Sequence, residues 1–414
     1  MPETRAAGLT MPLNWNNFRA SAVPNWMKHM NPRRLLLALS LALAAVAAPL
    51  LSSAAKAEPI ATNAKHLYIV DFQTGSVIYD KMGEERLYPA SMSKLMTAYM
   101  LFDALKRGDV KLTDTFHVSE KAWATQGSKM FVDIDSDVKV EDLIRGMVIQ
   151  SGNDACVVIA EGLAGSEEAF ADRMNEKGKE IGLTGSNFRN STGWPDPDHY
   201  MTAKDLSVLA ARLIRDFPEY YHFYSEKEFT WHDIKQGNRN PLLYRTGSGV
   251  DGLKTGHTED AGFGLTASAI RDGRRIVMVV QGLSGMQERA DEAGQLLDWA
   301  FRETGNFTVV SKGAVLAEAP VEYGETKTVP LTVSQDLTLT LPRADRQKVT
   351  AKAVVPTPIM APVAAGQELG KLVVSAPNMP DFTISLVAAQ DVTEMGVGGR
   401  IVANLQRLVF GTPQ

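Results

Sequence analysis

Hydrophobic and polar residues follow three different patterns along this chain. Near the N-terminus, Arg33-Arg34 precede an uncharged run from Leu35 to Leu51. Between about residues 60 and 303, β-like runs stand at both ends and helical periodicity dominates the middle. Beyond Gly305, short alternating runs are separated by proline and glycine, which is typical of β-strands. The pattern predicts a leader, an α/β domain and a small all-β domain.

The segment 58–303 is expected to hold a sheet flanked by helices, with a helical subdomain inserted. Strand runs flanking a turn predict one hairpin at His66–Asp71 and Ser76–Tyr79, and a second at Gly264–Ile270 and Arg275–Gly282. Helices are predicted at Ser91–Lys106, Glu167–Gly182, Asp205–Arg215 and Met286–Arg302.

Residues 306–391 are expected to form the all-β domain, for which the sequence offers no recognisable chemistry. Its predicted strands are Phe307–Val310, Lys327–Val333, Leu337–Leu341, Val349–Val355, Lys371–Ser375 and Phe382–Val387.

The tail, residues 396–414, has the pattern of an amphipathic helix. Val397, Ile401, Leu405 and Leu408 fall on one helical stripe, and no acidic residue occurs from Gly396 onward. Such a helix is too short and too polar to span a bilayer, but it suits the headgroup layer. We predict a membrane-surface anchor; the alternatives are a frayed tail or a helix packed on the β domain.

Residues 1–57 have the pattern of a leader with a secretory signal peptide. The apolar run ends in small residues and Ala55-Lys56-Ala57, which predicts cleavage after Ala57. An uncleaved membrane anchor is the alternative, although 17 apolar residues make a marginal span. Residues 1–26 are long for a leader, so Met27 and Met30 are alternative starts. We expect an exported protein, periplasmic and peripheral on the outer face of the cytoplasmic membrane.

Removal of the leader makes the chain more acidic. The leader holds six of the 43 basic and one of the 48 acidic residues, which leaves 37 basic and 47 acidic residues and a net charge of −10. This balance argues against nucleic-acid binding through bulk charge. The single cysteine, Cys156, allows no internal disulfide, and the seven histidines have no metal-ligand spacing, so we expect neither a metal nor another cofactor.

Three short motifs occur in one order: Ser91-Met-Ser-Lys94, Ser151-Gly-Asn153 and Lys254-Thr-Gly256. Ser91 lies at the predicted start of a helix, where a lysine three residues later reaches its hydroxyl. The second motif lies on a predicted turn between helices, and the third follows a glycine-rich turn beside strand-like sequence. A nucleophile, an amine base, a proton relay and a charged anchor suit acyl transfer without a catalytic histidine.

Each motif is weak alone, and the chain itself shows this. Ser53 and Ser136 also precede a lysine by three positions, and Arg245-Thr-Gly247 resembles the third motif. Only the order and the sequence context make the combination informative.

The set resembles the serine penicillin-binding enzymes. It is most similar to the low-molecular-weight D-alanyl-D-alanine carboxypeptidases, over roughly residues 60–390. The resemblance rests on Tyr88-Pro-Ala-Ser-Met-Ser-Lys94, Ile149-Gln-Ser-Gly-Asn-Asp-Ala-Cys156, Val250-Asp-Gly-Leu-Lys-Thr-Gly-His257 and Leu296-Leu-Asp-Trp299. It implies a penicillin-binding/β-lactamase-like fold, a peptidoglycan pentapeptide substrate and covalent inhibition by β-lactams.

The resemblance also implies roles for individual residues. Ser91 would be the nucleophile, Lys94 its base and Ser151 the proton relay, with Asn153 orienting Lys94 and the substrate amide. The backbone N–H of His257 would join that of Ser91 in an oxyanion hole. Lys254, Thr255 and Gly256 would lie at the substrate, and the charge of Lys254 would lower the pKa of Lys94. Arg289 stands where the family has a carboxylate-binding arginine, although a surface arginine fits the pattern equally well.

Other functions stay open at this point. A D-alanyl endopeptidase or a weak β-lactamase could use the same residues. The sequence lacks a convincing deacylating glutamate motif, since Glu180-Ile-Gly-Leu-Thr184 reads better as a helix end. A peptidoglycan-binding protein with a vestigial site is the non-enzymatic alternative.

Overall fold

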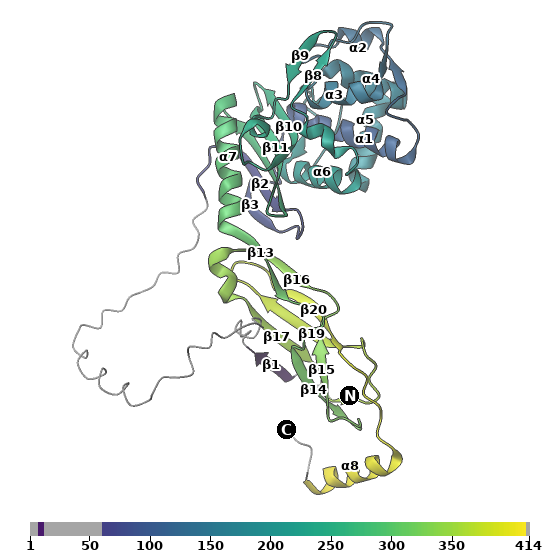
Figure 1. Cartoon of the computed structure of the whole chain (residues 1–414), viewed down its shortest axis with the longest axis vertical. Coiled ribbons are helices and arrows are strands. Elements are labelled where there is room, and N and C mark those ends of the chain that lie inside the picture. The colour runs from purple at the N-terminus through teal and green to yellow at the C-terminus, as the bar shows by residue number, and fades with distance from the viewer. Residues whose placement is uncertain (1–6, 12–59, 411–414) are drawn as a thin grey trace, which may run out of the picture. The chain divides into compact units, whose positions relative to one another are not determined.

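The computed structural model describes residues 7–11 and 60–410 and divides them into two compact units (Figure 1). The larger unit spans Pro59–Phe307 with Thr338–Arg343, and the smaller holds most of the remaining C-terminal chain. The predicted fold class, a penicillin-binding-like α/β domain followed by an all-β domain, is confirmed.

A five-stranded antiparallel sheet forms the frame of the larger unit. Its order is β10 (Val250–Thr258), β11 (Gly262–Arg271), β12 (Arg274–Leu283), β2 (His66–Asp71) and β3 (Val77–Lys81). The helix α7 (Met286–Glu303) buries Ala293, Leu297 and Ala300 among apolar residues of the sheet. Because the helical subdomain covers the opposite face, β12 is apolar without interruption from Ile276 to Val280.

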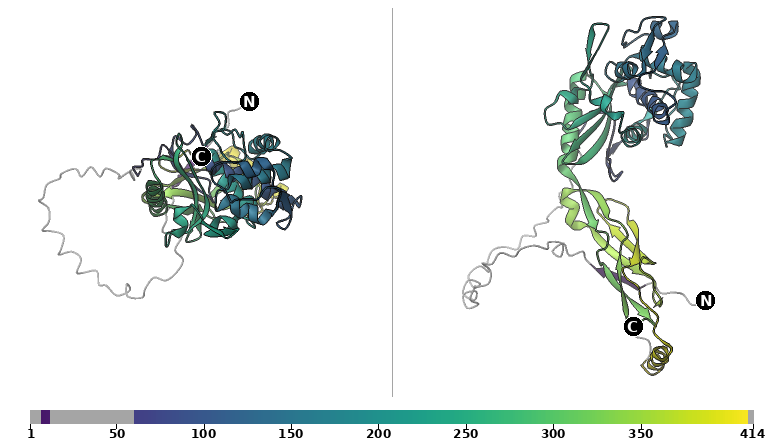
Figure 2. Two further views of the ribbon diagram at one scale, coloured as in Figure 1. Left: turned by 90° about the horizontal axis from the view of Figure 1, so that it is seen from above. Right: turned by 45° about the vertical axis from the view of Figure 1, so that its right-hand side comes forward.

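The helical subdomain packs around one long, buried helix. This helix, α1 (Lys94–Arg107), buries most of its length and is capped at its C-terminus by Gly108, which adopts φ +78°. Around it lie α2 (Glu120–Ala124), α3 (Val140–Val148), α4 (Asn153–Ala164), α5 (Glu167–Glu180) and α6 (Ala203–Asp216). The views in Figure 2 show these helices grouped on one side of the sheet.

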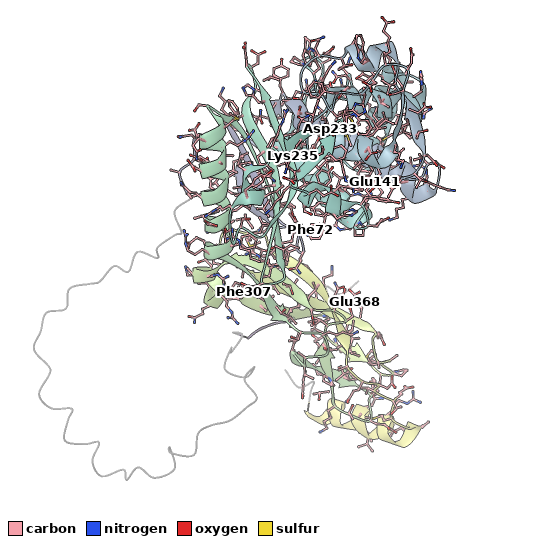
Figure 3. The ribbon with its side chains drawn as sticks, turned by 45° about the horizontal axis from the view of Figure 1, so that its top comes forward. Phe72, Glu141, Asp233, Lys235, Phe307 and Glu368 are labelled. Carbon is pink, nitrogen blue, oxygen red and sulfur yellow. The ribbon has the colours of Figure 1, made fainter. Side chains whose placement is uncertain are left out.

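Short elements complete the larger unit. They are the pairs β4 (Arg86–Leu87) with β7 (Met201–Thr202), β5 (Thr115–His117) with β6 (Asp137–Lys139), and β8 (Glu228–Trp231) with β9 (Ile234–Gly237), and the 3₁₀ turns Ala90–Ser93, Tyr221–Ser225 and Pro241–Tyr244. The β8–β9 hairpin, marked by Asp233 and Lys235 in Figure 3, is not predicted from the sequence. Its residues show no clean alternation because both strands are largely exposed.

The smaller unit is built on a seven-stranded sheet of order β1-β17-β19-β20-β15-β14-β18. Its strands are β1 (Ala7–Met11), β14 (Ala317–Glu322), β15 (Thr328–Thr332), β17 (Thr350–Val355), β18 (Ile359–Met360), β19 (Glu368–Ser375) and β20 (Phe382–Ala388). Outside this sheet, β13 (Thr304–Val310) pairs with β16 (Leu337–Pro342), of which Thr338–Pro342 is counted with the larger unit, and a 3₁₀ turn covers Arg343–Lys348.

All six strand runs predicted beyond residue 305 have a counterpart, but β14 and β18 are missed. β14 reads A-E-A-P-V-E, where alanine and proline hide the alternation that its burial pattern shows. Of the predicted leader, Ala7–Met11 is described as a strand paired with β17. The remainder, including the predicted signal peptide and its cleavage point, lies outside the described residues.

The last described element is the helix α8 (Val397–Phe410), within the segment expected to be amphipathic. Val397, Ile401 and Leu405 are all more than half exposed, so this apolar stripe has no cover in the described structure. No helix in residues 7–11 and 60–410 is both long and apolar enough to cross a membrane.

Candidate active site

Ser91 and Lys94 are in direct contact at the start of α1. Ser91 lies in the 3₁₀ turn Ala90–Ser93, and Lys94 is the first residue of the helix. The ammonium of Lys94 donates to Ser91 Oγ at 2.9 Å and to the carbonyl oxygen of Thr192 at 2.6 Å. Lys94 is only 1% exposed. The structure therefore brings together a hydroxyl and a buried amine at the spacing that the sequence predicts.

Burial is the main cause of the altered basicity of Lys94. It lowers the pKa of this amine to about 8, and the charge of Arg239 lowers it further. Burial and then the charge of Lys94 lower the pKa of Lys254 well below its usual value. Repulsion between two cations acts on both partners, so the role of Lys254 in lowering the pKa of Lys94 stays a prediction.

The loop around Thr192 is a part of the site that the sequence does not reveal. Asn190 Oδ1 accepts hydrogen bonds from the backbone N–H groups of Thr192, Gly193 and Trp194 at 2.8–3.1 Å, which folds the loop back on itself. The loop thereby presents the Thr192 carbonyl to Lys94. Because this acceptor is a backbone atom, no residue type marks it in the sequence.

A buried histidine ties the same loop to the nucleophile turn. His199 Nδ1 accepts from the Arg189 N–H at 3.2 Å, so Nε2 carries the proton and donates to Ser93 Oγ at 2.7 Å. Burial lowers the pKa of His199 to about 4, which keeps the ring neutral at pH 7. His199 is thus a positioning residue for the turn that carries Ser93. Across the described residues, no three His, Cys, Asp or Glu side chains converge as a metal site.

Ser151 and Asn153 lie on the turn between α3 and α4, as predicted. Ser151 adopts the left-handed conformation, φ +63°, and its buried Oγ has no hydrogen-bond partner within the described structure. A strained residue with an unsatisfied hydroxyl is typical of a functional position. Asn153 differs from the expectation, because its amide donates to the Gln126 carbonyl at 2.7 Å and it is not among the partners of Lys94.

Asp154, which the sequence analysis does not single out, holds this turn in place. Its fully buried carboxylate accepts from the backbone N–H groups of Met130, Phe131 and Val132 at 2.8–3.3 Å. Hydrogen bonds to a carboxylate are among the stronger ones in proteins. Asp154 therefore fixes the segment 130–132 against the start of α4, where Ser151 and Asn153 lie.

Lys254, Thr255 and Gly256 lie on β10, which is an edge strand of the sheet. The sequence predicts this motif beside a turn, but the glycine-rich segment from Val250 is already part of the strand. A side chain at Gly256 would put its Cβ 2.7 Å from the Pro89 carbonyl oxygen, so glycine permits close approach to the turn that carries Ser91. An edge strand leaves alternate backbone groups unpaired, as an extended ligand requires.

Arg289 is buried, which excludes the surface reading of this residue. It lies in the first turns of α7, is 6% exposed, and its guanidinium carbon is 5.8 Å from the Phe263 ring centroid. Its buried Nε has no hydrogen-bond partner among the described residues. Burial lowers its pKa to about 10.

Positive charge accumulates here without compensation. Lys94, Lys254 and Arg289 are buried, and none of them is within 4.0 Å of a carboxylate in the part of the chain that the structure describes. The exposed Arg239, which donates to Ser128 Oγ at 2.7 Å, lowers the pKa of all three. The sequence does not reveal the contribution of Arg239, because this residue belongs to none of the three motifs. Unpaired buried cations suit an anionic ligand.

His257 is the last predicted site residue. Its side chain is exposed and stacks on Phe263 at a centroid distance of 3.9 Å, so the imidazole takes no part in the cluster around Ser91. Only its backbone, on the edge strand next to Gly256, lies at a position relevant to the site.

Comparisons with known proteins agree with this geometry. A family model described as D-alanyl-D-alanine carboxypeptidase matches residues 52–285, and a model of the penicillin-binding protein 5 C-terminal domain matches residues 305–394. The D-alanyl-D-alanine carboxypeptidase DacA of Haemophilus influenzae is 36% identical over 348 residues, covering 83% of this chain and 88% of that protein.

Solved structures show the same likeness. Penicillin-binding protein 5 from Haemophilus influenzae superposes with a TM-score of 0.70 at 37% identity and covers 81% of this chain and 99% of that chain. Penicillin-binding protein D2 from Listeria monocytogenes, solved with ampicillin bound, has a TM-score of 0.54 at 25% identity over 59% of this chain and 99% of that chain.

Fold and site define a serine acyl-transfer enzyme of the penicillin-binding class. Within that class, the chain belongs to the D-alanyl-D-alanine carboxypeptidase family.

The close approach at Gly256 generates a prediction. Gly256→Ala should lower the rate constant for acylation of Ser91 by a β-lactam about 100-fold, because moving β10 misplaces the groups that hold the ligand. Stopped-flow acylation measures this. The control is Gly285→Ala, since a Cβ at Gly285 meets no atom within 4 Å. A Gly256→Ala rate within twofold of wild type would contradict the prediction.

Proposed function

We propose that this enzyme removes the terminal D-alanine from peptidoglycan pentapeptides through an acyl-enzyme on Ser91. The observation that carries the proposal is the group of buried, unpaired cations beside a serine in contact with a buried amine. A peptide ending in D-Ala-D-Ala supplies the missing anion as its terminal carboxylate. Lys254 and Arg289 bind this carboxylate, together with Thr255.

Acylation begins with proton transfer from Ser91 Oγ to the neutral amine of Lys94, which lies 2.9 Å away. The oxygen attacks the carbonyl carbon of the penultimate D-alanine and forms a tetrahedral oxyanion. The backbone N–H groups of Ser91 and His257 stabilise this oxyanion, each by about 3 kcal/mol. The Thr192 carbonyl, also bonded to Lys94, keeps the amine aimed at Ser91.

Breakdown of the intermediate requires a proton on the leaving nitrogen. Ser151 Oγ, which is buried and unpartnered, relays the proton from Lys94 to this nitrogen as the C–N bond breaks. Asn153 borders the same space and contacts the substrate amide. Water then cleaves the Ser91 ester and releases the shortened peptide.

The first experiment follows Ser91 directly. Ser91→Ala should abolish both covalent labelling by a fluorescent penicillin and D-alanine release from a muropeptide pentapeptide. Ser136→Ala is a matched control, because Ser136 also precedes a lysine by three positions and its hydroxyl only donates to the Asp133 carbonyl. Labelling of Ser91→Ala at the wild-type rate would contradict the assignment.

The same assays separate the alternatives. Preferential cleavage of cross-linked dimers over monomeric pentapeptides would favour an endopeptidase, and rapid loss of the penicilloyl adduct a β-lactamase. Glu180, in the motif nearest to a deacylating glutamate, ends α5 and pairs with Lys177 at 2.7 Å. Binding of sacculi without any D-alanine release would favour a binding protein.

The pKa of Lys94 predicts the pH dependence of acylation. The base must be neutral, and its fraction in the neutral form rises about tenfold per pH unit below a pKa of about 8. The acylation rate constant should therefore rise steeply from pH 6 to 7 and level off above about pH 8. Stopped-flow acylation with a penicillin, which has no ionisation in this range, measures the profile. A flat profile between pH 6 and 8 would contradict Lys94 as the base.

We also propose that the mature chain is exported and held on the outer face of the cytoplasmic membrane by α8. The exposed stripe of Val397, Ile401 and Leu405 supports this, as does Arg400, since an apolar face with basic flanks suits the headgroup layer.

Deletion of residues 396–414 tests the anchor. It should move the protein from membrane to soluble periplasmic fractions and leave D-alanine release in solution unchanged, since α8 belongs to the unit without the site. Ile401→Asp with Leu405→Asp should reproduce the shift without shortening the chain. A truncated protein that still pellets with membranes after confirmed signal cleavage would refute the anchor.

A further inference from the structure

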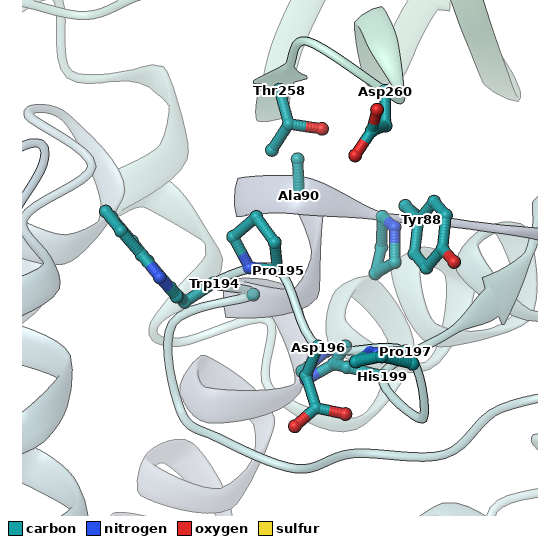
Figure 4. Close-up of a pocket in the computed structure, with 11 residues that line it drawn as sticks. Tyr88, Ala90, Trp194, Pro195, Asp196, Pro197, His199, Thr258 and Asp260 are labelled. Carbon is teal, nitrogen blue, oxygen red and sulfur yellow. The ribbon is translucent and has the colours of Figure 1, made fainter.

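A hollow of about 230 Å³ lies beside the turn Ala90–Ser93, which carries Ser91 (Figure 4). One wall is formed by Tyr88, Pro89 and Ala90, while Thr258 at the end of β10 and Asp260 in the turn after it add to the lining. The opposite wall is the loop from Gly193 to His199, which includes Trp194 and Asp196. None of the catalytic side chains lines it. Its volume suits one side chain better than a drug-sized ligand.

The position of this hollow relates it to the upstream part of a bound peptide. On β10, Lys254 and Thr255 come first, and Thr258 follows after Gly256 and His257. A peptide whose terminal carboxylate lies at Lys254 therefore extends along the edge strand toward Thr258. An extended residue advances about 3.3 Å along a strand, so the residue just before the acylated D-alanine lies near Gly256, whose neighbours Pro89 and Ala90 form a wall of the hollow. A long side chain on this residue extends from there into the hollow.

The charge of this hollow is opposite to that of the site proposed for the substrate's terminal carboxylate, where Lys254 and Arg289 lie. Its lining holds two carboxylates, Asp196 and Asp260, and no lysine or arginine. Asp260 has no hydrogen-bond or ion-pair partner among the described residues, and the carboxylate of Asp196 accepts only from the Asp198 N–H at 2.7 Å. His199, which also lines it, is neutral at pH 7 because burial lowers its pKa to about 4.

Two aromatic side chains complete the lining. Tyr88 is 45% and Trp194 is 50% exposed, so both rings present surface to a ligand. An aromatic face attracts a cation. A carboxylate beside an aromatic ring therefore binds a cation more strongly than a carboxylate beside an aliphatic wall. In Figure 4, Asp260 lies at the upper edge and Asp196 at the lower edge of the group of side chains that line the hollow.

We infer that this hollow, defined by Tyr88, Trp194, Asp196 and Asp260, is a subsite for a cationic side chain. Its ligand is the ammonium-bearing side chain of the residue that precedes D-Ala-D-Ala in the stem peptide. The inference rests on the proposed function, which places the peptide on β10. With cations at one end of the groove and carboxylates at the other, a peptide that carries a terminal carboxylate and an upstream ammonium is bound in one direction only.

Two synthetic peptides isolate the charge. Nα-acetyl-L-lysyl-D-alanyl-D-alanine carries the ammonium, and the analogue with L-2-aminoheptanoic acid in place of lysine carries a methyl group at that position. For the wild-type enzyme, kcat/KM should be about five- to tenfold higher for the lysyl peptide. In the double variant Asp196→Asn, Asp260→Asn this ratio should fall to about one. The ratio is informative because a general loss of activity lowers both rates equally.

Asp198→Asn is the matched control, because Asp198 is exposed, lies on the same loop and does not line the hollow. It removes the same charge and should keep the wild-type ratio. Equal wild-type rates on the two peptides, or a ratio unchanged in the double variant, would overturn the subsite and leave the carboxypeptidase intact. Absence of D-alanine release from both peptides, with Ser91 still acylated by penicillin, would instead overturn the proposed function and the subsite with it.

Discussion

Positive charge that is buried without a carboxylate partner is the constraint around which the larger unit is organised. Lys94, Lys254 and Arg289 come from a helix start, an edge strand and a second helix, and each loses hydration as it is buried. Removing an ammonium ion from water costs several kcal/mol even after relaxation. Lowered pKa values reduce this cost for all three groups, and Lys94 also donates two hydrogen bonds and Lys254 one, to the Thr255 carbonyl. A bound anion compensates the charge that remains.

The surrounding fold keeps these groups apart from the carboxylates that would neutralise them. Asp154 is a buried acid that directly follows the second motif. Its two carboxylate oxygens accept hydrogen bonds from the backbone N–H groups of residues 130–132. The loop acceptor for Lys94 is an uncharged carbonyl, which orients the amine without raising its pKa as a carboxylate would. The rigid frame that this needs comes from two apolar layers, one on each face of the sheet.

Local sequence predicts the elements and the motif residues, because each depends on neighbours a few positions away. The hairpins, the helix ending at Gly108 and the turn before Asn153 are all of this kind. The sequence does not reveal the roles of Thr192, Arg239 and Asp154, because these roles depend on contacts between distant segments. The role of Thr192 also depends on a backbone atom, which no residue type marks. The near-miss Arg245-Thr-Gly247 shows the same point: Arg245 follows a 3₁₀ turn, lies outside any strand and pairs with Asp298.

The hollow beside Ser91 is likewise not marked by any sequence motif. Its two carboxylates stand 64 positions apart in the chain and are brought together only where the Gly193–His199 loop faces the end of β10. Gly193 makes that approach possible, since it has φ +77° and any side chain there would overlap the Ala90 carbonyl. The loop that supplies the acceptor for Lys94 thus also forms a wall of the acidic hollow. One segment therefore links the orientation of the Lys94 amine to the shape of the neighbouring hollow.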